Sequence, residues 1–369
     1  MNQFSYEQFI RPDIVEMEPY VPIVPFEVLS ERLGRLPKDI TKLDANENPY
    51  GPSSAALEAI ITGKWFHIYP DPESNLLRKA LSNYLGVPKE RLLAGMGADE
   101  LIDLILRAVL SPGDRVINCP PTFGMYPFST AVNGGEIINI ERNEDFSLNI
   151  DRIISESRSY PNARVLFICS PNNPDGSLIP HEDLICLLDL NLIIVLDEAY
   201  IEFAAVDGYE SRFHWALNQK NLIVLRTFSK LAALAGLRVG YGIFPEWLLP
   251  HLWKIKQPYN INVAASLAAV ASLENPQWME RNVSLIVNER KRMVRELEHF
   301  DFLKPYPSSA NFVLFKVLGR SAALLKQELS KEGVLVRYFD KPGLANCIRI
   351  SAGRPADTER LVSALKKVA

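Results

Sequence analysis

The chain has 369 residues, more than one hydrophobic core ordinarily organises, so at least two domains are expected. Its hydrophobic residues (47%) and charged residues (23%) match an average soluble globular protein. The net charge of -4 and the pI near 5.9 indicate no basic surface of the kind that binds nucleic acid or an anionic membrane.

The cysteines and the N-terminal composition bear on the compartment. The cysteines have no CxxC or Cys/His spacing, so neither a metal site nor a disulfide framework is predicted. The N-terminal stretch has neither the apolar core of a secretory signal nor the Arg/Ser-rich, acid-poor composition of a transit peptide. The most apolar stretches, such as residues 104–110, are too short to cross a bilayer. We therefore expect a cytoplasmic protein with no metal, no nucleic-acid partner and no membrane anchor.

Residues 1–40 are rich in proline, with one short helix predicted at residues 26–33. This composition indicates an extended arm, which could pack with the C-terminal domain.

Between residues 41 and 250, short runs of Val, Ile and Leu alternate with amphipathic stretches. Runs without polar alternation are typical of strands buried on both faces of a mostly parallel sheet. Helical periodicity between them, clearest at residues 98–110, supplies the crossovers of a doubly wound α/β sheet. The predicted strands are residues 91–94, 115–118, 136–140, 164–169, 192–196, 222–225 and 239–244.

The pattern of apolar residues changes again after residue 250, and residues 251–369 are predicted to form a smaller α+β domain. Its expected elements are a long helical stretch from residue 262 to about residue 300, strands at 311–317 and 334–337, and helices at 321–332 and 356–368.

Unusual polar residues follow several predicted strands, at the ends where open α/β sheets bind ligands. Residues 95–100 form a small-residue turn that opens a helix and presents free backbone N–H groups, which suit a phosphate. Such turns are also common without a ligand. Asn173 lies in a proline-rich turn, where it either points an amide into the crevice or belongs to a plain turn.

Two charged residues follow buried strands. Asp197 is costly to bury unless it meets a cation, and both a helix N-terminus and a protonated ring nitrogen would serve. A lone lysine such as Lys230 is usually a solvated surface residue, but a desolvated lysine can lose its proton and form an imine. Thr227 and Ser229 precede it and Arg238 follows, and these three could hold a phosphate dianion.

These signals are modest singly, but their order along the chain is specific. A glycine turn, an aromatic ring, an Asn-Pro turn, Asp-x-x-Tyr, Ser-Lys and an arginine at successive strand ends are the groups that pyridoxal phosphate needs. The ring is Phe123, which would be unremarkable as a core residue. A GxGxxG turn is missing, which argues against a dinucleotide-binding dehydrogenase.

With these residues in place, the sequence resembles the histidinol-phosphate aminotransferases of the fold-type-I pyridoxal-phosphate-dependent aminotransferase family, over nearly the whole chain. The matching motifs are Leu-Asp-Ala-Asn-Glu-Asn-Pro-Tyr-Gly-Pro-Ser at residues 43–53, Tyr-Pro-Asp at 69–71, Gly-Ala-Asp-Glu at 97–100, Cys-Pro-Pro-Thr-Phe-Gly-Met-Tyr at 119–126 and Thr-Phe-Ser-Lys at 227–230. The first motif, together with Pro19-Tyr20, points to this subfamily rather than to aminotransferases at large.

The resemblance implies catalytic roles for three residues. Lys230 would form the imine with the cofactor and later move the proton, and Asp197 would pair with the pyridine nitrogen. Tyr200 would bond the phenolic oxygen together with Asn173.

The resemblance also implies the remaining binding residues. Phe123 would stack on the ring, and Tyr69 would reach the cofactor phosphate from the partner subunit of a homodimer with shared sites. The phosphate would otherwise be held by Ala98, Asp99, Thr227, Ser229 and Arg238. The substrate would be bound by Tyr20, Asn48, Arg337 and Arg349, with Arg349 on its carboxylate. Arg337 could instead form a surface ion pair.

Two positions depart from the family pattern. Asp175 replaces the usual threonine after Asn-Pro, which places a carboxylate near the cofactor turn, and Phe123 stands where many relatives have tyrosine. The implied reaction is ping-pong amino transfer from glutamate to imidazole-acetol phosphate, giving 2-oxoglutarate and histidinol phosphate in histidine biosynthesis. The alternatives are an aromatic-amino-acid aminotransferase, a threonine-phosphate decarboxylase-like enzyme, and a non-catalytic binding protein on the same fold.

Overall fold

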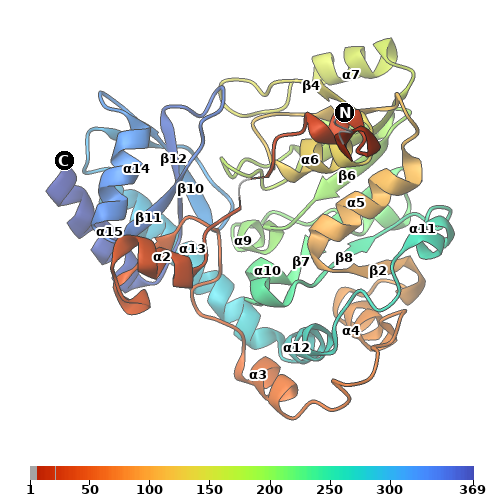
Figure 1. The fold of residues 1–369 in the computed structure, drawn as a ribbon, viewed down its shortest axis with the longest axis horizontal. Coiled ribbons are helices and arrows are strands. Elements are labelled where there is room, and N and C mark those ends of the chain that lie inside the picture. Colours follow the sequence, from red (N-terminus) through yellow and green to blue (C-terminus); the bar gives the residue numbers. More distant parts are fainter. Residues whose placement is uncertain (1–5, 21) are drawn as a thin grey trace, which may run out of the picture.

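The computed structural model describes residues 6–20 and 22–369, and these residues form two sheets (Figure 1). The larger sheet has seven strands in the order β2-β8-β7-β6-β5-β3-β4. They are β2 (Leu92–Gly95), β3 (Arg115–Asn118), β4 (Glu136–Asn139), β5 (Ala163–Cys169), β6 (Ile193–Asp197), β7 (Leu222–Thr227) and β8 (Gly240–Ile243). Each apolar run predicted as a strand in the large domain lies here, so the prediction of a doubly wound α/β sheet is confirmed.

The strand directions differ in one respect from a fully parallel sheet. The neighbours from β4 to β7 run parallel, whereas β8 runs antiparallel to both β2 and β7. Burial on both faces is wrong for β4, because it is an edge strand whose Glu136 and Asn139 are exposed. In the centre, Cys169 pairs with Asp197, and Asp197 pairs with Leu225. The carboxyl ends of β5, β6 and β7 therefore lie side by side.

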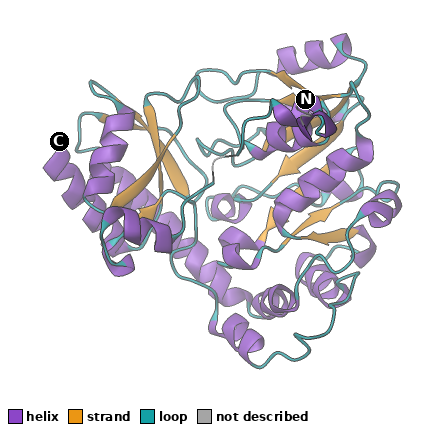
Figure 2. Cartoon of the chain, viewed as in Figure 1, coloured by secondary structure: helices purple, strands orange, loops and turns teal. Residues whose placement is uncertain are grey.

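Helices cover both faces of this sheet (Figure 2). One face is covered by α5 (Gly97–Val109), α6 (Met125–Val132) and α11 (Leu249–Ile255). The other face packs against α3 (Ser54–Ile61), α4 (Asn75–Leu85), α7 (Ile150–Ser159), α8 (His181–Leu188), α9 (Ile201–Ala205), α10 (Phe228–Leu231), α12 (Val263–Glu274) and part of α13 (Pro276–Leu297). The sheet is thus the middle layer of three, with an apolar core on each side.

The smaller sheet has five strands in the order β1-β11-β12-β10-β9. Its elements are β1 (Thr41–Leu43), β9 (Leu303–Pro305), β10 (Phe312–Val317), β11 (Val334–Tyr338) and β12 (Cys347–Ser351), with α14 (Ala322–Lys331) and α15 (Pro355–Val368) packed on them. The sequence predicts β10, β11, α14 and α15 but misses β1, β9 and β12. The first two are only three residues long, and β12 carries a charged residue at its centre.

Two segments cross the expected domain boundaries. Strand β1, expected in the large domain, pairs in parallel with β11 of the small sheet. Helix α12, expected in the small domain, packs on α3 and α4 and shares the core of the large sheet. The helical stretch predicted from residue 262 onward is two helices, because α12 ends at Glu274 and Pro276 opens α13.

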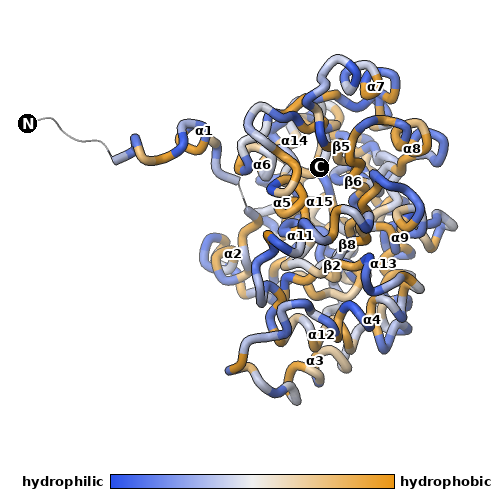
Figure 3. The backbone as a smooth tube through the Cα atoms, turned by 90° about the vertical axis from the view of Figure 1, so that its right-hand side faces the viewer, coloured by the Kyte–Doolittle hydropathy of each residue, from blue (hydrophilic) through white to orange (hydrophobic). Residues whose placement is uncertain are grey.

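The arm divides between the two domains. Helix α2 (Phe26–Leu33) packs on the small domain through Leu29 and Leu335, as expected for the arm. Helix α1 (Pro12–Val15) lies beside α6, where the Arg11 side chain donates to the Val132 carbonyl at 3.0 Å. Figure 3 shows α1 projecting from the body of the molecule. Among the described residues, no helix combines the length and apolar character that a membrane span requires.

Candidate active site

A cavity of about 940 Å³ lies between the two domains, over the carboxyl ends of β5, β6 and β7. This is the place where open α/β sheets bind ligands. Its lining includes these residues expected from the sequence: Tyr20, Ala98, Asp99, Phe123, Asn173, Asp197, Tyr200, Thr227, Ser229, Lys230, Arg238, Arg337 and Arg349. The fold therefore gathers most of the predicted site into one chamber.

One end of the cavity is formed by the first turn of α5. Ala98 and Asp99 line it, and the first backbone N–H groups of a helix have no partner within that helix. Gly97 adopts φ = +79°, a left-handed conformation that glycine accepts without strain. At Gly240 of β8, a Cβ would lie 2.7 Å from the backbone N of Ala98, so only glycine lets the turn approach this strand. The turn is thus held where a phosphate can meet its N–H groups.

Side chains complete this anion site. The Thr227 hydroxyl donates to the Ser229 hydroxyl at 2.9 Å, and both line the cavity. Arg238 adds a guanidinium, which donates to the Asp99 carboxylate at 2.9 Å. Because Arg238 neutralises it, Asp99 can take part through its backbone without repelling an anion.

Lys230 is half-buried in the single turn of α10 and lines the cavity. Its Nζ donates to the carbonyl oxygen of Ala45 at 3.3 Å. Burial, assisted by the nearby positive charge of Arg349, lowers the pKa of Lys230 to about 8. Far more of this amine is therefore neutral near neutral pH than in an ordinary lysine, and the neutral form is the one that attacks a carbonyl.

Asp197 ends β6 and is 3% exposed. It accepts hydrogen bonds from the Tyr126 hydroxyl at 2.8 Å and from the backbone N–H of Ala199 at 3.1 Å. Burial raises the pKa of Asp197 to about 6, although these two hydrogen bonds lower it. The side chain is thus oriented into the cavity, in surroundings where a cationic partner would stabilise its charge.

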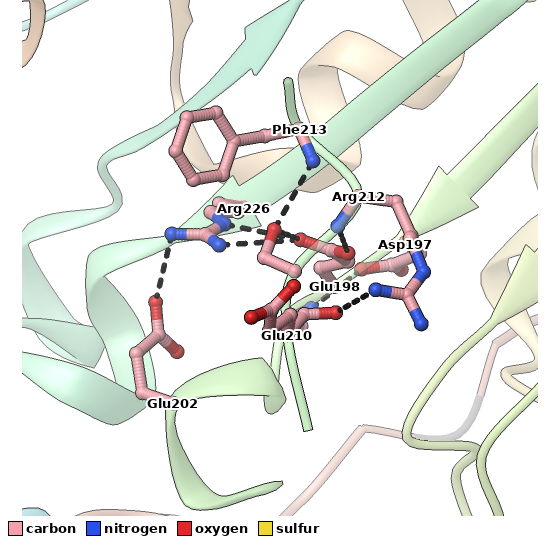
Figure 4. Close-up of polar contacts among 9 residues, drawn as sticks. Asp197, Glu198, Glu202, Glu210, Arg212, Phe213 and Arg226 are labelled. Atoms are coloured by element: carbon pink, nitrogen blue, oxygen red, sulfur yellow. Dashed lines mark hydrogen bonds and ion pairs between the residues drawn. The ribbon is translucent and has the colours of Figure 1, made fainter. Parts of the chain in front are cut away.

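The residues next in sequence form an ion cluster behind the site (Figure 4). Successive side chains of a strand point to opposite faces, so Glu198 and Arg226 face away from the cavity that Asp197 and Thr227 line. Arg226 donates to Glu198 at 3.2 Å and lies 3.5 Å from Glu202. Glu198 also accepts from the backbone N–H of Arg212 at 2.8 Å and from the Ser211 hydroxyl. This buried cluster links the ends of β6 and β7 on the side that faces away from the cavity.

Two arginines from the small domain face the cavity. Arg349 of β12 is directly opposite Arg337 of β11 in the antiparallel pair, and both line the chamber. Arg349 donates to the Asp44 carbonyl oxygen at 2.8 Å and to the Asn173 side chain, while its Nε is buried without a partner. Burial, together with the positive charge of Arg337, lowers the pKa of Arg349 to about 10. Like charges opposite each other are unfavourable, so this pair favours a bound anion.

Residues 44–48, which follow β1, form a strap that contributes Ala45 and Asn46 to the cavity lining. The strap carbonyls of Asp44 and Ala45 accept from Arg349 and Lys230 respectively. Asn48 does not line the cavity: its amide donates to the carbonyls of Lys230 at 3.0 Å and Leu231 at 3.3 Å. In this structure the Asn48 amide thus holds the backbone of Lys230, and its binding to substrate stays a prediction.

The remaining predicted residues lie as follows. Tyr20 lines the cavity and packs edge-on against Phe128, with ring centroids 5.8 Å apart. Phe123 also lines it and contacts Tyr126 in the same manner at 5.6 Å. Tyr69 does not: it is 80% exposed and stacks on Tyr259 at 4.8 Å.

The departure at Asp175 affects the turn rather than the cavity. The Asp175 side chain is buried outside the lining, where it accepts from the Asn172 amide and from the backbone N–H of Ser177 at 2.7 Å. At the following Gly176, a Cβ would lie 2.0 Å from the Ser308 hydroxyl of the small domain. Asp175 therefore rigidifies a turn that contacts the other domain, instead of placing a carboxylate beside the cofactor.

The charges in the chamber fit pyridoxal phosphate. Among the described residues, the ion pairs do not include Asp197, Lys230 or Arg349, although Asp197 and Arg349 are buried. The carboxylate would pair with a protonated ring nitrogen, and the lysine would bond to the aldehyde carbon. The α5 turn, Thr227, Ser229 and Arg238 would hold the phosphate. The chemistry of the donor set therefore matches the cofactor expected from the sequence.

Several residues in contact with the site are missed by the sequence reading. Tyr126, which orients Asp197, lies in the motif at residues 119–126. It is fully buried, and its residue type alone does not indicate a role in the site. Asn46, whose amide donates to the Tyr200 hydroxyl at 3.1 Å, also lies in a quoted motif. Only their contacts in the fold distinguish them from structural neighbours.

Comparison with known proteins gives the same result. A family model described as aminotransferase class I and II matches residues 38–365. The chloroplastic histidinol-phosphate aminotransferase of Nicotiana plumbaginifolia is 52% identical over 98% of this chain and 86% of the relative. The histidinol-phosphate aminotransferase of Roseiflexus castenholzii is 47% identical over 99% of both chains. A similar solved structure is the histidinol-phosphate aminotransferase of Sinorhizobium meliloti in complex with pyridoxal-5'-phosphate. Its TM-score is 0.87 at 27% identity, and the match covers 100% of this chain and 99% of that one.

Proposed function

The chain belongs to the class I and II aminotransferase family, and from that premise we propose that it transfers an amino group between histidinol phosphate and 2-oxoglutarate. The products are imidazole-acetol phosphate and glutamate, and the reverse direction forms histidinol phosphate in histidine biosynthesis. The observation that carries the substrate class is the cross-strand pair of Arg337 and Arg349, which faces the cavity beside Lys230. The relatives named above act on the same substrate by their names.

Each residue of the site has a separate role in the proposed reaction. When bound, pyridoxal phosphate supplies an electron-accepting ring that stabilises negative charge at the carbon bearing the amino group. Asp197 would hold the ring nitrogen in its protonated state, and Tyr200 would donate to the phenolic oxygen, since both line the cavity. Lys230 would hold the cofactor covalently, and its free amine would move the proton at the substrate carbon as a general acid and base.

The two arginines distinguish the substrates. Glutamate presents a carboxylate next to its amino carbon, whereas histidinol phosphate presents a phosphate ester on a methylene. A guanidinium can bind either anion through paired N–H donors, but the phosphate dianion carries more charge. Arg349 therefore serves both substrates, and Arg337 adds the second positive charge that the phosphate requires.

An assay of donors tests the proposed function. The purified holoenzyme is given 2-oxoglutarate with histidinol phosphate, phenylalanine, tyrosine or threonine phosphate, and glutamate formation is measured. We expect the largest kcat/KM for histidinol phosphate. A preference for an aromatic donor, or release of carbon dioxide from threonine phosphate, would assign the chain to one of the alternative activities.

Substitution of the two arginines should separate the half-reactions. Arg349→Ala is expected to slow both, by roughly a hundred-fold, because a buried charged hydrogen bond to each substrate is lost. Arg337→Ala should slow the histidinol-phosphate half-reaction by at least about ten-fold and largely spare the glutamate half-reaction. Single-turnover absorbance changes measure each half separately. An equal loss in both halves for Arg337→Ala would remove this residue from the phosphate site.

The exposed apolar residues support a homodimer with shared active sites. Large apolar side chains are exposed along α3 and the loop after it: Leu57, Ile61, Trp65, Phe66, Ile68 and Tyr69. A cluster of this kind is typical of a protein–protein interface. We infer that Tyr69 projects from this surface towards the cofactor phosphate of a second copy of the chain.

Mixing two inactive variants tests the shared site. Tyr69→Phe and Lys230→Ala subunits are unfolded together and refolded, and cofactor-dependent turnover is compared with that of each variant alone. In a shared-site heterodimer, one site has both native residues and the other has neither, so turnover should rise above that of both parents. If the wild-type protein sedimented as a monomer and had full activity in that state, the shared site would be refuted.

We propose that the protein is cytoplasmic. This location is supported by the four free cysteines, Cys119, Cys169, Cys186 and Cys347, which form no disulfide. Fractionation of the source cells tests it, and recovery of the protein from an organelle would contradict it.

A further inference from the structure

We propose that Asn46 is a positioning residue that fixes the direction of the Tyr200 hydroxyl, so that Tyr200 donates its proton into the cavity. This inference rests on the proposed function, in which that proton is donated to the phenolic oxygen of pyridoxal phosphate. It extends that function by assigning a role to a residue of the strap that does not react itself.

Asn46 is at the centre of a buried network between the two domains. It is 1% exposed and has φ = +55°, a left-handed conformation that asparagine tolerates better than most residues. Its side-chain amide donates to the Tyr200 hydroxyl of the large domain at 3.1 Å. Its backbone carbonyl accepts from the Asn311 amide of the small domain at 2.9 Å. The remaining contacts are with Ser351, at the end of β12.

The contacts with Ser351 determine which way the Asn46 amide points. The Ser351 hydroxyl oxygen accepts from the backbone N–H of Asn46 at 2.9 Å. The same hydroxyl donates its hydrogen to the Asn46 side-chain oxygen at 3.1 Å. If the amide were reversed, the buried Ser351 hydroxyl would face an N–H group and lose this acceptor, which is costly. The amide oxygen therefore faces Ser351, and the amide N–H faces Tyr200.

This orientation decides what Tyr200 can do. A phenol has one proton to donate, and here its oxygen accepts from Asn46. Among the described residues no acceptor takes the hydroxyl hydrogen of Tyr200, and the side chain lines the cavity. Burial raises the pKa of Tyr200 above its usual range, so the phenol keeps its proton, and the hydrogen bond from Asn46 partly opposes this rise. Tyr200 is thus prepared as a donor towards a ligand.

The network also joins Tyr200 to the substrate end of the site. Ser351 lies two residues after Arg349 on the same strand, and Arg349 donates to the strap at Asp44. The orientation of Asn46 therefore depends on the strand that binds the substrate anion, while its effect is on a residue of the other domain. Residues scattered from 46 to 351 act as one hydrogen-bonded unit.

The substitution Asn46→Asp tests the direction of this hydrogen bond. Aspartate has nearly the same size and also tolerates the left-handed backbone, but its carboxylate accepts and cannot donate. Tyr200 would then donate its proton to residue 46 instead of to the cofactor. The readout is the pH midpoint of the visible absorbance of the holoenzyme, measured without substrates. We expect it to rise by about one pH unit, since loss of a donor to the phenolic oxygen makes the cofactor more basic.

A double-mutant cycle separates this effect from the added negative charge. Tyr200→Phe alone should raise the midpoint by a similar amount, because it removes the same donor. If Asn46 acts through Tyr200, then Asn46→Asp should add only a few tenths of a unit in the Tyr200→Phe background, whereas independent effects would add. An undiminished shift in that background would overturn the proposal.

Two further variants keep the proposal testable if the aspartate variant does not fold. Ser351→Ala releases the amide, so the midpoint should move in the same direction by a smaller amount, again only when Tyr200 is present. Asn311→Ala removes a bond to the Asn46 carbonyl without affecting the amide, so it should lower Tm and leave the midpoint unchanged. A midpoint shift in Asn311→Ala as large as in Asn46→Asp would contradict the proposal, as would no shift in Ser351→Ala.

These titrations distinguish failure of the inference from failure of the proposed function. A wild-type holoenzyme with a normal visible band but no turnover of histidinol phosphate would remove the proposed substrate and leave the role of Asn46 intact. The reverse result, normal turnover with an unshifted midpoint in Asn46→Asp, would remove only the role of Asn46. A wild-type protein with no visible band would remove both.

Discussion

Lys230→Ala is expected to abolish covalent attachment of pyridoxal phosphate and to slow amino transfer by roughly a thousand-fold or more. The variant loses both the amine that bonds to the cofactor and the group that moves the proton. Borohydride reduction of the wild-type holoenzyme followed by peptide mapping measures the attachment. The label should be found on the peptide that contains Lys230, and a label on another lysine would show that the site was assigned wrongly.

The pH dependence of attachment gives a second measurement of the same residue. Only the neutral amine attacks the cofactor aldehyde, and this form is present above the pKa of the lysine. Because burial lowers the pKa of Lys230 to about 8, attachment to the cofactor-free protein should accelerate through about pH 8 rather than above pH 10. Arg349→Met is a matched variant, since it removes the positive charge that contributes to the lowered pKa. Its midpoint should lie at higher pH.

Asp197→Asn is expected to leave the fold intact and to cut turnover by about a hundred-fold or more, because an uncharged amide does not hold the ring nitrogen protonated. Cofactor binding should survive, since the phosphate and the lysine are held by other residues. Steady-state kcat, together with the circular-dichroism melting curve, tests both statements.

Tyr126→Phe provides the control for this position. It removes the 2.8 Å hydrogen bond to Asp197 but keeps the carboxylate and the ring that stacks on Phe167. Its loss of turnover should therefore be much smaller than that of Asp197→Asn. Near-wild-type turnover in Asp197→Asn would mean that the carboxylate stabilises the turn and does not act on the cofactor.

The large domain could be predicted from the sequence because its signals are local. Strands such as β5 and β6 are continuous apolar runs, and a run of this kind specifies a strand buried on both faces wherever it lies. The chemistry at the strand ends was equally visible, since Asp197 is the last residue of β6 and Lys230 lies in the short helix that follows β7. Motif order along the chain then identified the cofactor.

The tertiary structure decided what depends on contacts between distant segments. Strand β1 belongs to the small sheet because its partner, β11, lies nearly 300 residues later, and three residues carry no pattern of their own. Helix α12 belongs with the large domain because α3 and α4 cover it. Domain boundaries drawn from the local sequence pattern therefore place both β1 and α12 in the wrong domain.

The same reason applies to the amides of the site. Asn46 and Asn48 are both amides in one motif, and nothing in their residue type tells which one contacts substrate. In the fold, Asn48 holds the backbone of Lys230 and Asn46 holds the Tyr200 hydroxyl. Composition, periodicity and motif order by themselves determined the fold class and the cofactor, and they predicted which residues react. Hydrogen-bond direction needs the three-dimensional position of both partners, so only the tertiary structure decided which side chains orient those that react.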